Sequence, residues 1–328
     1  MFAKIAAFSF PALLGVLALG STLWAADPAK PAAAKTAAPK PAAAKTAPAA
    51  KPAAAAAAPA KADAAKADAP KADAVKELRL YALDCGKVEF KDMGFFSDTG
   101  EYDGKSGSVA TPCFLIRHPK GTLLWDTGLG DKLAENKGGG DGPMTPSVSV
   151  TLADQLKALG LSASDVTHVA FSHFHFDHTG NANNFPSAIW LLNQTELNWA
   201  TGKPTPFGVV PESFSAYKNA KTIMVTGDHD VFGDGSVRML KAPGHTPGHQ
   251  VLAIKLAKAG MVVLSGDLYH LRDNRKYKRV PGINSDRADT LASFDRIEKI
   301  VSNKKARFVI QHDPNDFKAL PKFPAYLQ

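Results

Sequence analysis

The strongest constraint on folding is a long block of residues that cannot contribute to a core. Residues 26–75 consist of 27 Ala, 8 Pro, 8 Lys, 4 Asp, 2 Thr and one Val. Such a segment buries too little apolar surface to offset the entropy lost on ordering, so we expect a disordered Ala/Lys/Pro-rich linker. Folding is thereby confined to residues 76–328, a length that suits one α/β domain with a large core.

The linker also carries much of the charge. The formal net charge is +8, of which Lys4 supplies +1 and residues 26–75 supply +4, so that +3 remains for residues 76–328. A nucleic-acid-binding domain would need a broad basic surface, and this balance does not provide one. We therefore expect no nucleic-acid partner. The Lys-rich linker could still contact the anionic cell envelope.

The first 25 residues have the pattern of a secretory signal peptide. A short basic start is followed by a mostly apolar run at residues 5–24 and by Ala25, a suitable position for cleavage. The alternative is an uncleaved anchor, because the run approaches the roughly 20 residues needed to span a bilayer. The signal peptide predicts a periplasmic or secreted protein. In an oxidising compartment Cys85 and Cys113 could form a disulfide if their strands are neighbours, or could simply be buried apolar residues.

Apolar runs and turn signals in residues 76–328 predict alternating strands and helices. Strands are predicted at 78–83, 113–117, 122–125, 168–171, 189–192, 237–240, 251–254, 261–264 and 308–310, and helices at 151–159, 194–200 and 289–301. Strands gather early and late with helices between them, which indicates an α/β fold with two sheets sandwiched between helices. The Gly-rich segment from 130 to 146 is expected to be a long loop.

A cluster of imidazole and carboxylate groups directly follows the strand predicted at 168–171. Three His and one Asp fall within six residues, namely His173, His175, Asp177 and His178. Such groups are the ligands that borderline divalent ions such as Zn²⁺ prefer. Side chains alternate along an extended chain, so His173 and His175 project to one side and can bind one ion together. Asp177 and His178 follow where the chain turns and can face a second ion.

Further candidate ligands occur downstream, each at the end of a predicted strand. They belong to the segments Gly244-His245-Thr246-Pro247-Gly248-His249, Gly266-Asp267 and Gln311-His312-Asp313. The carboxyl ends of strands are where the ligand sites of α/β sheets gather. We therefore expect these groups to join the cluster at 173–178.

In this order the motifs resemble those of the metallo-β-lactamase superfamily, over residues 78–328 approximately. The resemblance implies a four-layer αβ/βα sandwich with two divalent metal ions, expected to be zinc, at one edge. The implied ligands are His173, His175 and His245 for one ion, Asp177, His178 and His312 for the other, and Asp267 as a bridge between them. Asp126 and His249 would support these ligands from behind.

Two neighbouring cations would lower the pKa of a bridging water, so that hydroxide forms at neutral pH and attacks an electrophilic carbonyl or phosphoryl group. Asp177 could then pass a proton to the leaving group. Secreted β-lactamases of the superfamily lack a bridging Asp at the position of Asp267. The segments 80–86, 116–129 and 311–314 look like those of N-acyl-homoserine lactonases, which open the lactone ring of quorum-sensing signals.

We therefore expect a dinuclear metal-dependent lactone hydrolase that acts in quorum quenching. A secreted arylesterase or organophosphate (methyl-parathion-type) hydrolase and a β-lactamase are the enzymatic alternatives. A non-enzymatic alternative is an envelope-binding protein that keeps the metal scaffold, since the linker could contact the envelope. The expected partner is a small-molecule ester or lactone, and the chain could act as a monomer or homodimer.

One position departs from the lactonase pattern. Related lactonases place a Tyr three residues after the bridging Asp, where it contacts the substrate carbonyl. This chain has His270 there and Tyr269 one residue earlier, and either side chain could donate a hydrogen bond to the developing oxyanion. An acyl substrate would also need an apolar wall, for which the candidates are Phe95, Phe96, Met144 and the loop at 207–210.

Overall fold

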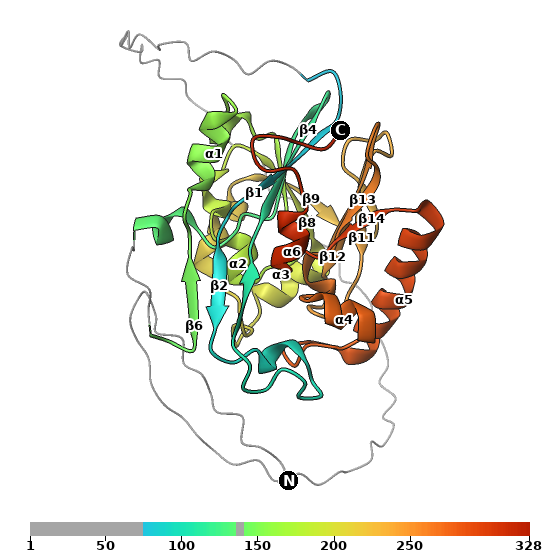
Figure 1. The fold of residues 1–328 in the computed structure, drawn as a ribbon. Helices are drawn as coiled ribbons and strands as arrows, with labels where there is room; N and C mark the ends of the chain where they lie inside the picture. Colours follow the sequence, from blue (N-terminus) through green and yellow to red (C-terminus); the bar gives the residue numbers. More distant parts are fainter. Residues whose placement is uncertain (1–74, 136–140) are drawn as a thin grey trace, which may run out of the picture. The chain divides into compact units, whose positions relative to one another are not determined.

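The computed structural model describes residues 75–135 and 141–328, and these form a layered α/β domain (Figure 1). The expected signal peptide at residues 1–25 lies outside the described residues, as does the expected linker up to residue 74. Two main sheets pack against each other with helices on their outer sides, so the predicted α/β sandwich is confirmed. Among the described helices, none is long and apolar enough to cross a membrane.

The first main sheet contains six strands in the order β1-β4-β5-β7-β8-β9. These strands are β1 (Arg79–Leu83), β4 (Cys113–His118), β5 (Gly121–Trp125), β7 (His168–Ala170), β8 (Ile189–Asn193) and β9 (Lys221–Val225). β4 and β5, at the positions of two predicted strands, form an antiparallel hairpin in which Phe114 lies opposite Trp125. β7 follows in parallel to β5, and its carboxyl end leads directly into the His cluster.

The second main sheet has five strands in the order β10-β11-β12-β13-β14. They are β10 (His229–Asp230), β11 (Val237–Lys241), β12 (Gln250–Leu256), β13 (Gly260–Leu264) and β14 (Arg307–Val309). A smaller sheet, which the sequence did not predict, has the order β3-β2-β6 and consists of β2 (Lys87–Phe90), β3 (Gly107–Ala110) and β6 (Met144–Ser147). β6 corrects the expectation of a continuous loop from 130 to 146, because its backbone pairs with that of β2.

Six α-helices complete the described domain. They are α1 (Leu152–Ala158), α2 (Phe176–Thr179), α3 (Gln194–Ala200), α4 (Arg272–Tyr277), α5 (Arg287–Lys304) and α6 (Pro314–Lys318). α1 and α5 lie on opposite sides of the sheets (Figure 1). α1 buries Leu152 and Leu156 in the apolar cluster of the first sheet, whereas α5 buries Phe294 and Ile297 in a cluster on the second sheet.

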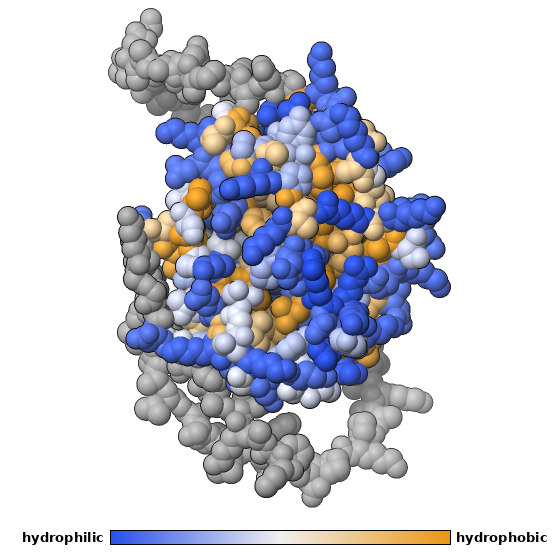
Figure 2. Space-filling model, viewed as in Figure 1, coloured by the Kyte–Doolittle hydropathy of each residue, from blue (hydrophilic) through white to orange (hydrophobic). Residues whose placement is uncertain are grey.

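The space between the two main sheets is filled by large apolar side chains. Phe114 and Trp125 of the first sheet belong to the same buried cluster as Leu252 and Val262 of the second. Along each strand, residues that face this space alternate with residues that face outward, because strand side chains point to opposite faces with a period of two. On the outside, hydrophilic residues cover much of the face drawn in Figure 2, with smaller apolar areas between them.

A disulfide joins Cys85 to Cys113 and settles the alternatives left open by the sequence. β1 and β4 are antiparallel neighbours with Leu83 opposite Cys113, so Cys85 lies just beyond the paired strand end. The bridge packs against Gly128, where an added Cβ would lie 2.3 Å from the Cβ of Cys85. The disulfide therefore supports the loop that follows β5 and carries Asp126.

Candidate metal centre

The ligands predicted from the sequence come together where strands of both main sheets end. They lie on the segments that follow β7, β11, β13 and β14, with Asp177 and His178 in α2. Their ligand atoms fall into two groups, each with all atoms within 4.8 Å of one another, namely His173, His175, His245 and Asp267 in the first and Asp177, His178 and His312 in the second. The grouping agrees with the division between two ions that the sequence predicted.

The first group consists of buried side chains that converge on one point. His175 Nδ1 lies 2.9 Å from His173 Nε2 and 3.1 Å from His245 Nε2. The Oδ2 atom of Asp267 lies 3.3 Å from His245 Nε2. Such spacings suit donor atoms that share one ion at bond lengths of about 2.0–2.2 Å.

The second group shares the same carboxylate through its other oxygen. Asp267 Oδ1 lies 3.1 Å from His178 Nε2 and 2.9 Å from His312 Nε2. Asp177 completes the group, with its Oδ2 atom 3.7 Å from His178 Nε2 and 3.6 Å from His312 Nε2. Asp267 thus presents one oxygen to each group, which is the arrangement that a bridging carboxylate requires.

Unpaired buried atoms show that these residues fit bound cations. Within the described chain, His178 Nε2 and Asp267 Oδ1 are buried and have no hydrogen-bond partner of good geometry. Buried polar atoms are normally satisfied, so atoms of this kind call for a ligand. Imidazole nitrogens and carboxylate oxygens suit zinc and related divalent ions. The donor set therefore fits two divalent ions.

The environment keeps several of these groups in the protonation state that binds metal. Burial lowers the pKa of His175 to about 3 and that of His245 to about 4, so both imidazoles are neutral at physiological pH. Burial alone would raise the pKa of Asp267, but the surrounding imidazoles, led by His312 and His178, hold it well below its usual range. Neutral imidazole and ionised carboxylate are the forms that coordinate cations.

Asp126 and His249, predicted to support the site, both contact ligand residues. The Asp126 carboxylate accepts hydrogen bonds from the Ser172 backbone N–H at 2.7 Å and from His178 Nδ1 at 3.0 Å. His249 Nδ1 donates to the Ala242 carbonyl at 2.8 Å, which leaves its Nε2 to accept the backbone N–H of Asp267 at 2.9 Å. Such contacts fix the orientation of the ligands and the tautomer of the rings.

Gln311 is a supporting residue that the sequence analysis missed. Its Nε2 donates to Asp126 Oδ2 at 2.9 Å, while its Oε1 accepts from Trp125 Nε1 at 3.0 Å and from the Gly266 backbone N–H at 2.8 Å. It therefore joins the loop after β5 to the loop that carries Asp267. Its only sequence signal was its place beside His312, because a Gln gives no indication of what it contacts.

Glu196 was also missed, since it lies on α3 among ordinary helix-forming residues. Its side chain is buried, and its two oxygens accept backbone hydrogen bonds from Phe174 at 3.0 Å and from Gly248 at 2.8 Å. Burial raises the pKa of this carboxyl to about 7. Both donors lie in loops that carry metal-ligand candidates.

The structure separates the two candidates for oxyanion stabilisation. His270 is buried at the centre, with its Nε2 3.0 Å from Asp267 Oδ2, and it forms a third close group with Asp267 and His312. Tyr269 points the other way, because neighbouring side chains of an extended backbone alternate. Its ring stacks on Phe294 at 4.2 Å between centroids. The prediction that Tyr269 could contact the oxyanion is therefore wrong.

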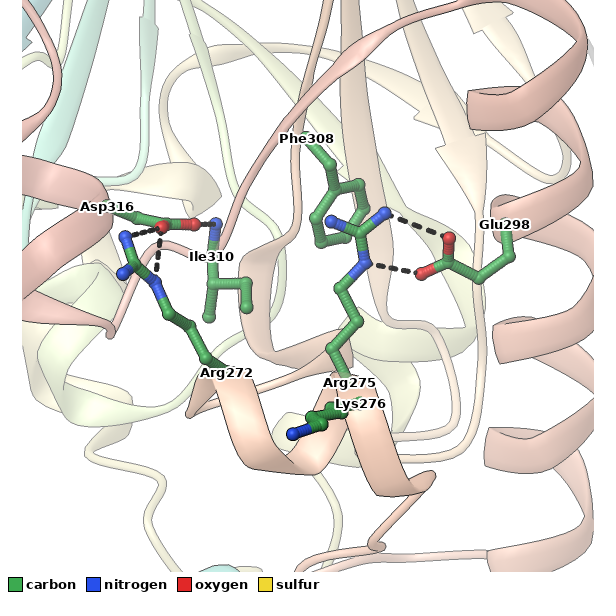
Figure 3. Close-up of a pocket in the computed structure, with 7 residues that line it drawn as sticks. All are labelled: Arg272, Arg275, Lys276, Glu298, Phe308, Ile310 and Asp316. Carbon is green, nitrogen blue, oxygen red and sulfur yellow. Dashed lines mark hydrogen bonds and ion pairs between the residues drawn. The ribbon is translucent and has the colours of Figure 1, made fainter.

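Beside α4, on the side toward which Tyr269 points, lies an open pocket of about 430 Å³ (Figure 3). It contains none of the predicted ligands, and its lining residues are Arg272, Arg275, Lys276, Glu298, Phe308, Ile310 and Asp316. Arg275 Nε contacts Glu298 at 2.7 Å and Arg272 Nε contacts Asp316 at 2.9 Å. Both guanidinium groups therefore already have carboxylate partners and are not free to bind a ligand.

Comparisons with known proteins agree with this geometry. A sequence profile described as the metallo-beta-lactamase superfamily matches residues 107–312. The N-acyl homoserine lactonase AttM of Rhizobium radiobacter is 31% identical over 265 residues, covering 76% of this chain and 99% of that protein. The N-acyl homoserine lactonase AiiA of Bacillus thuringiensis subsp. kurstaki is 28% identical over 231 residues, covering 68% of this chain and 89% of that protein.

Solved structures give the same result. An N-acyl homoserine lactone hydrolase with the product N-hexanoyl-L-homoserine bound at its catalytic metal centre superimposes with a TM-score of 0.67 at 26% identity, covering 77% of this chain and all of that one. AidC, a dizinc quorum-quenching lactonase, matches with a TM-score of 0.58 at 21% identity and so shows a common fold. The four-layer sandwich implied by the sequence motifs is thereby confirmed.

Proposed function

Because this chain belongs to the metallo-beta-lactamase superfamily, we propose that it is a metal-dependent hydrolase that opens the lactone ring of N-acyl homoserine lactones and so acts in quorum quenching. The observation that carries the proposal is the Asp267 carboxylate, which presents one oxygen to each ligand group. Relatives named N-acyl homoserine lactonases match across nearly their whole length, which supports the lactone as substrate.

Two divalent ions, which we propose to be zinc, would supply an activated water and stabilise negative charge on the carbonyl oxygen. The chain's own residues would orient the lactone and move a proton. Asp177 suits proton transfer because its side chain is 13% exposed, whereas His178 and His312 beside it are each 2% exposed. It can therefore meet both the leaving alkoxide and solvent.

His270 is proposed to bind the substrate carbonyl in the place where related lactonases carry a Tyr. Its Nε2 lies 3.0 Å from Asp267 Oδ2, so the imidazole is held beside the carboxylate that joins the two groups. Its Nδ1 is buried without a hydrogen-bond partner in the described chain. Donors fixed before the reaction stabilise a developing oxyanion without the cost of reorganising solvent.

Two of the predicted apolar elements lie beside the ligands, which supports an acyl substrate. Gly208 accepts a backbone hydrogen bond from Phe176, and an added Cβ on Gly208 would lie 2.7 Å from the His175 ring. The same loop leaves Phe207 56% exposed. At the other side of the centre the ring of Phe96 lies 5.0 Å from that of His270. We propose that the acyl chain contacts these two walls.

We also propose that the protein acts in the periplasm or outside the cell. The N-terminal 25 residues have the pattern of an export signal. The Cys85–Cys113 disulfide supports this location, because such bonds persist in oxidising compartments. The linker would then separate the catalytic domain from the envelope.

A hydrolysis panel with metal analysis tests the proposed function. Protein of verified metal content is offered N-hexanoyl and N-decanoyl homoserine lactones, an aryl ester, a phosphotriester and a β-lactam, and proton release is followed with a pH indicator. We expect the lactones to give the highest kcat/KM and chelation to abolish turnover. Faster turnover of the aryl ester or phosphotriester would replace the proposal by the alternative hydrolase, and no turnover of any substrate would exclude an enzyme of this class.

The proposed role of His270 has a matched control in its neighbour. His270→Phe should lower kcat for the lactone by about 100-fold, because it removes a fixed donor from the site of charge development. Tyr269→Phe should change kcat less than about threefold, since its hydroxyl lies away from the centre. Both variants are assayed at equal metal content. Equal effects of the two substitutions would contradict the assignment.

A further inference from the structure

We infer that Glu196 is a positioning residue of the metal centre, which holds together the two backbone loops that carry His173, His175 and His245. The loop at 172–175 follows β7 of the first sheet, and the loop at 243–249 follows β11 of the second. Glu196 belongs to neither loop, because it lies in the first turn of α3. Its effect on turnover rests on the proposed function, whereas its effect on metal binding does not.

The carboxylate of Glu196 divides its two oxygens between the loops. Its Oε1 accepts the backbone N–H of Phe174 at 3.0 Å, and its Oε2 accepts the backbone N–H of Gly248 at 2.8 Å. Phe174 stands between the ligand candidates His173 and His175 in the sequence. A shift of this peptide would therefore displace both imidazoles, which are attached to its two sides.

The second hydrogen bond acts on the neighbouring loop in the same way. Gly248 precedes His249, whose Nε2 accepts the backbone N–H of Asp267 at 2.9 Å. It also lies three residues after His245, whose Nε2 is 3.1 Å from His175 Nδ1. One carboxylate thus connects both sides of the first ligand group through hydrogen bonds from main-chain N–H groups.

The local structure fixes Glu196 where these contacts need it. The side chain of Asn193 caps α3 by accepting the backbone N–H groups of Thr195 at 2.9 Å and Glu196 at 3.2 Å. At Gly248 an added Cβ would lie 2.4 Å from the Glu196 backbone nitrogen and 2.5 Å from its Cβ, so a residue without a side chain is required there. The loop is therefore pressed against the start of the helix.

The burial of Glu196 makes the arrangement sensitive to chemistry and not only to volume. The residue is 2% exposed, and a buried carboxylate is tolerated only when it is hydrogen-bonded. Glu196→Gln keeps the size of the side chain but turns one acceptor into an amide NH₂, which would face a backbone N–H donor. One of the two loops must then lose its contact.

The experiment measures metal binding first and turnover second. Metal-free full-length protein, Glu196→Gln, Glu196→Ala and the exposed control Glu212→Gln are titrated with Co²⁺, and the visible absorption of the bound ion is recorded. Zinc affinity is measured by chelator competition, and lactone turnover is measured at full metal occupancy. We expect Glu196→Gln to weaken metal affinity about 10- to 100-fold and to alter the Co²⁺ spectrum, with a larger change for Glu196→Ala and none for the control.

The outcomes separate this inference from the proposed function. Unchanged Co²⁺ spectra and zinc affinities in folded Glu196→Gln would overturn the inference. A lower thermal midpoint of the metal-free variant, together with normal affinity and normal spectrum, would also overturn it, because Glu196 would then act on stability alone. Weaker metal binding in a chain that hydrolyses no lactone would support the role of Glu196 and exclude the proposed function.

Discussion

The two halves of the metal centre are built in different ways. Four ligand candidates, at positions 173 to 178, lie on one short stretch that runs from the end of β7 into α2, so the local chain path brings them together. The other three, His245, Asp267 and His312, lie on separate loops of the second half of the chain. The first half of the site depends on one loop, whereas the second depends on the register of a whole sheet.

Strand register shows how the dispersed half is assembled. β13 and β14 run parallel, with Leu264 opposite Val309. Asp267 and His312 each lie three residues beyond this pair. Parallel strands that end together therefore deliver both ligands to the same place, where their side chains approach to 2.9 Å. A shift of register in this sheet would separate them without altering the sequence of either loop.

The largest expected effect comes from removing the one carboxylate that both ligand groups share. Asp267→Asn takes away the charge that lies between the two groups, so kcat/KM for the lactone should fall at least about 1,000-fold, as loss of metal-assisted charge stabilisation costs several kcal/mol. His175→Ala, which affects only the first group, should lower metal binding there and leave the second group able to bind. Metal content is measured alongside turnover, and normal turnover of a metal-verified Asp267→Asn protein would contradict the bridging role.

The same difference decides how much the sequence could predict. The contiguous motif at 173–178 predicted a metal site by itself. The ends of the predicted strands indicated that His245, Asp267 and His312 would join it. The roles of Gln311 and Glu196 could not be predicted, because each depends on contacts between residues far apart in the chain. The small sheet of β2, β3 and β6 escaped prediction because short strands lack clear periodicity.

Tyr269 and His270 show that the sequence could not predict the direction of single side chains. The sequence placed both beside Asp267 but could not decide which one faces the metal centre, since a one-residue change of direction in an extended chain exchanges the two faces. Packing of the Tyr269 ring against Phe294 and Phe308 makes that choice. Neither partner lies near Asp267 in the sequence.

An intermediate effect is expected at Gln311, which joins the loop after β5 to the loop that carries Asp267. Gln311→Leu removes the hydrogen bond to Asp126 and leaves Trp125 Nε1 and the Gly266 N–H without their acceptor. Metal affinity or kcat/KM should fall about 10- to 100-fold, the usual cost of losing a residue that orients ligands. Chelator competition measures the affinity, and Gln194→Leu at a half-exposed position of α3 is the control. An effect no larger than that of the control would show that the halves hold together without Gln311.

The smallest expected effect on turnover comes from the disulfide beside the first main sheet, which contacts the loop after β5. Cys85 and Cys113 close a loop with a sequence separation of 28 residues, and replacing both by Ala should lower the free energy of unfolding by about 3.5 kcal/mol on chain-entropy grounds. The bridge touches Gly128 rather than any ligand candidate, so kcat/KM of the folded, metal-loaded variant should change less than about tenfold. Urea unfolding of the metal-free protein, with and without reductant, measures the first effect. A loss of turnover greater than that of Gln311→Leu would mean that the contiguous ligands at 173–178 depend on distant contacts as much as the ligands on separate loops do.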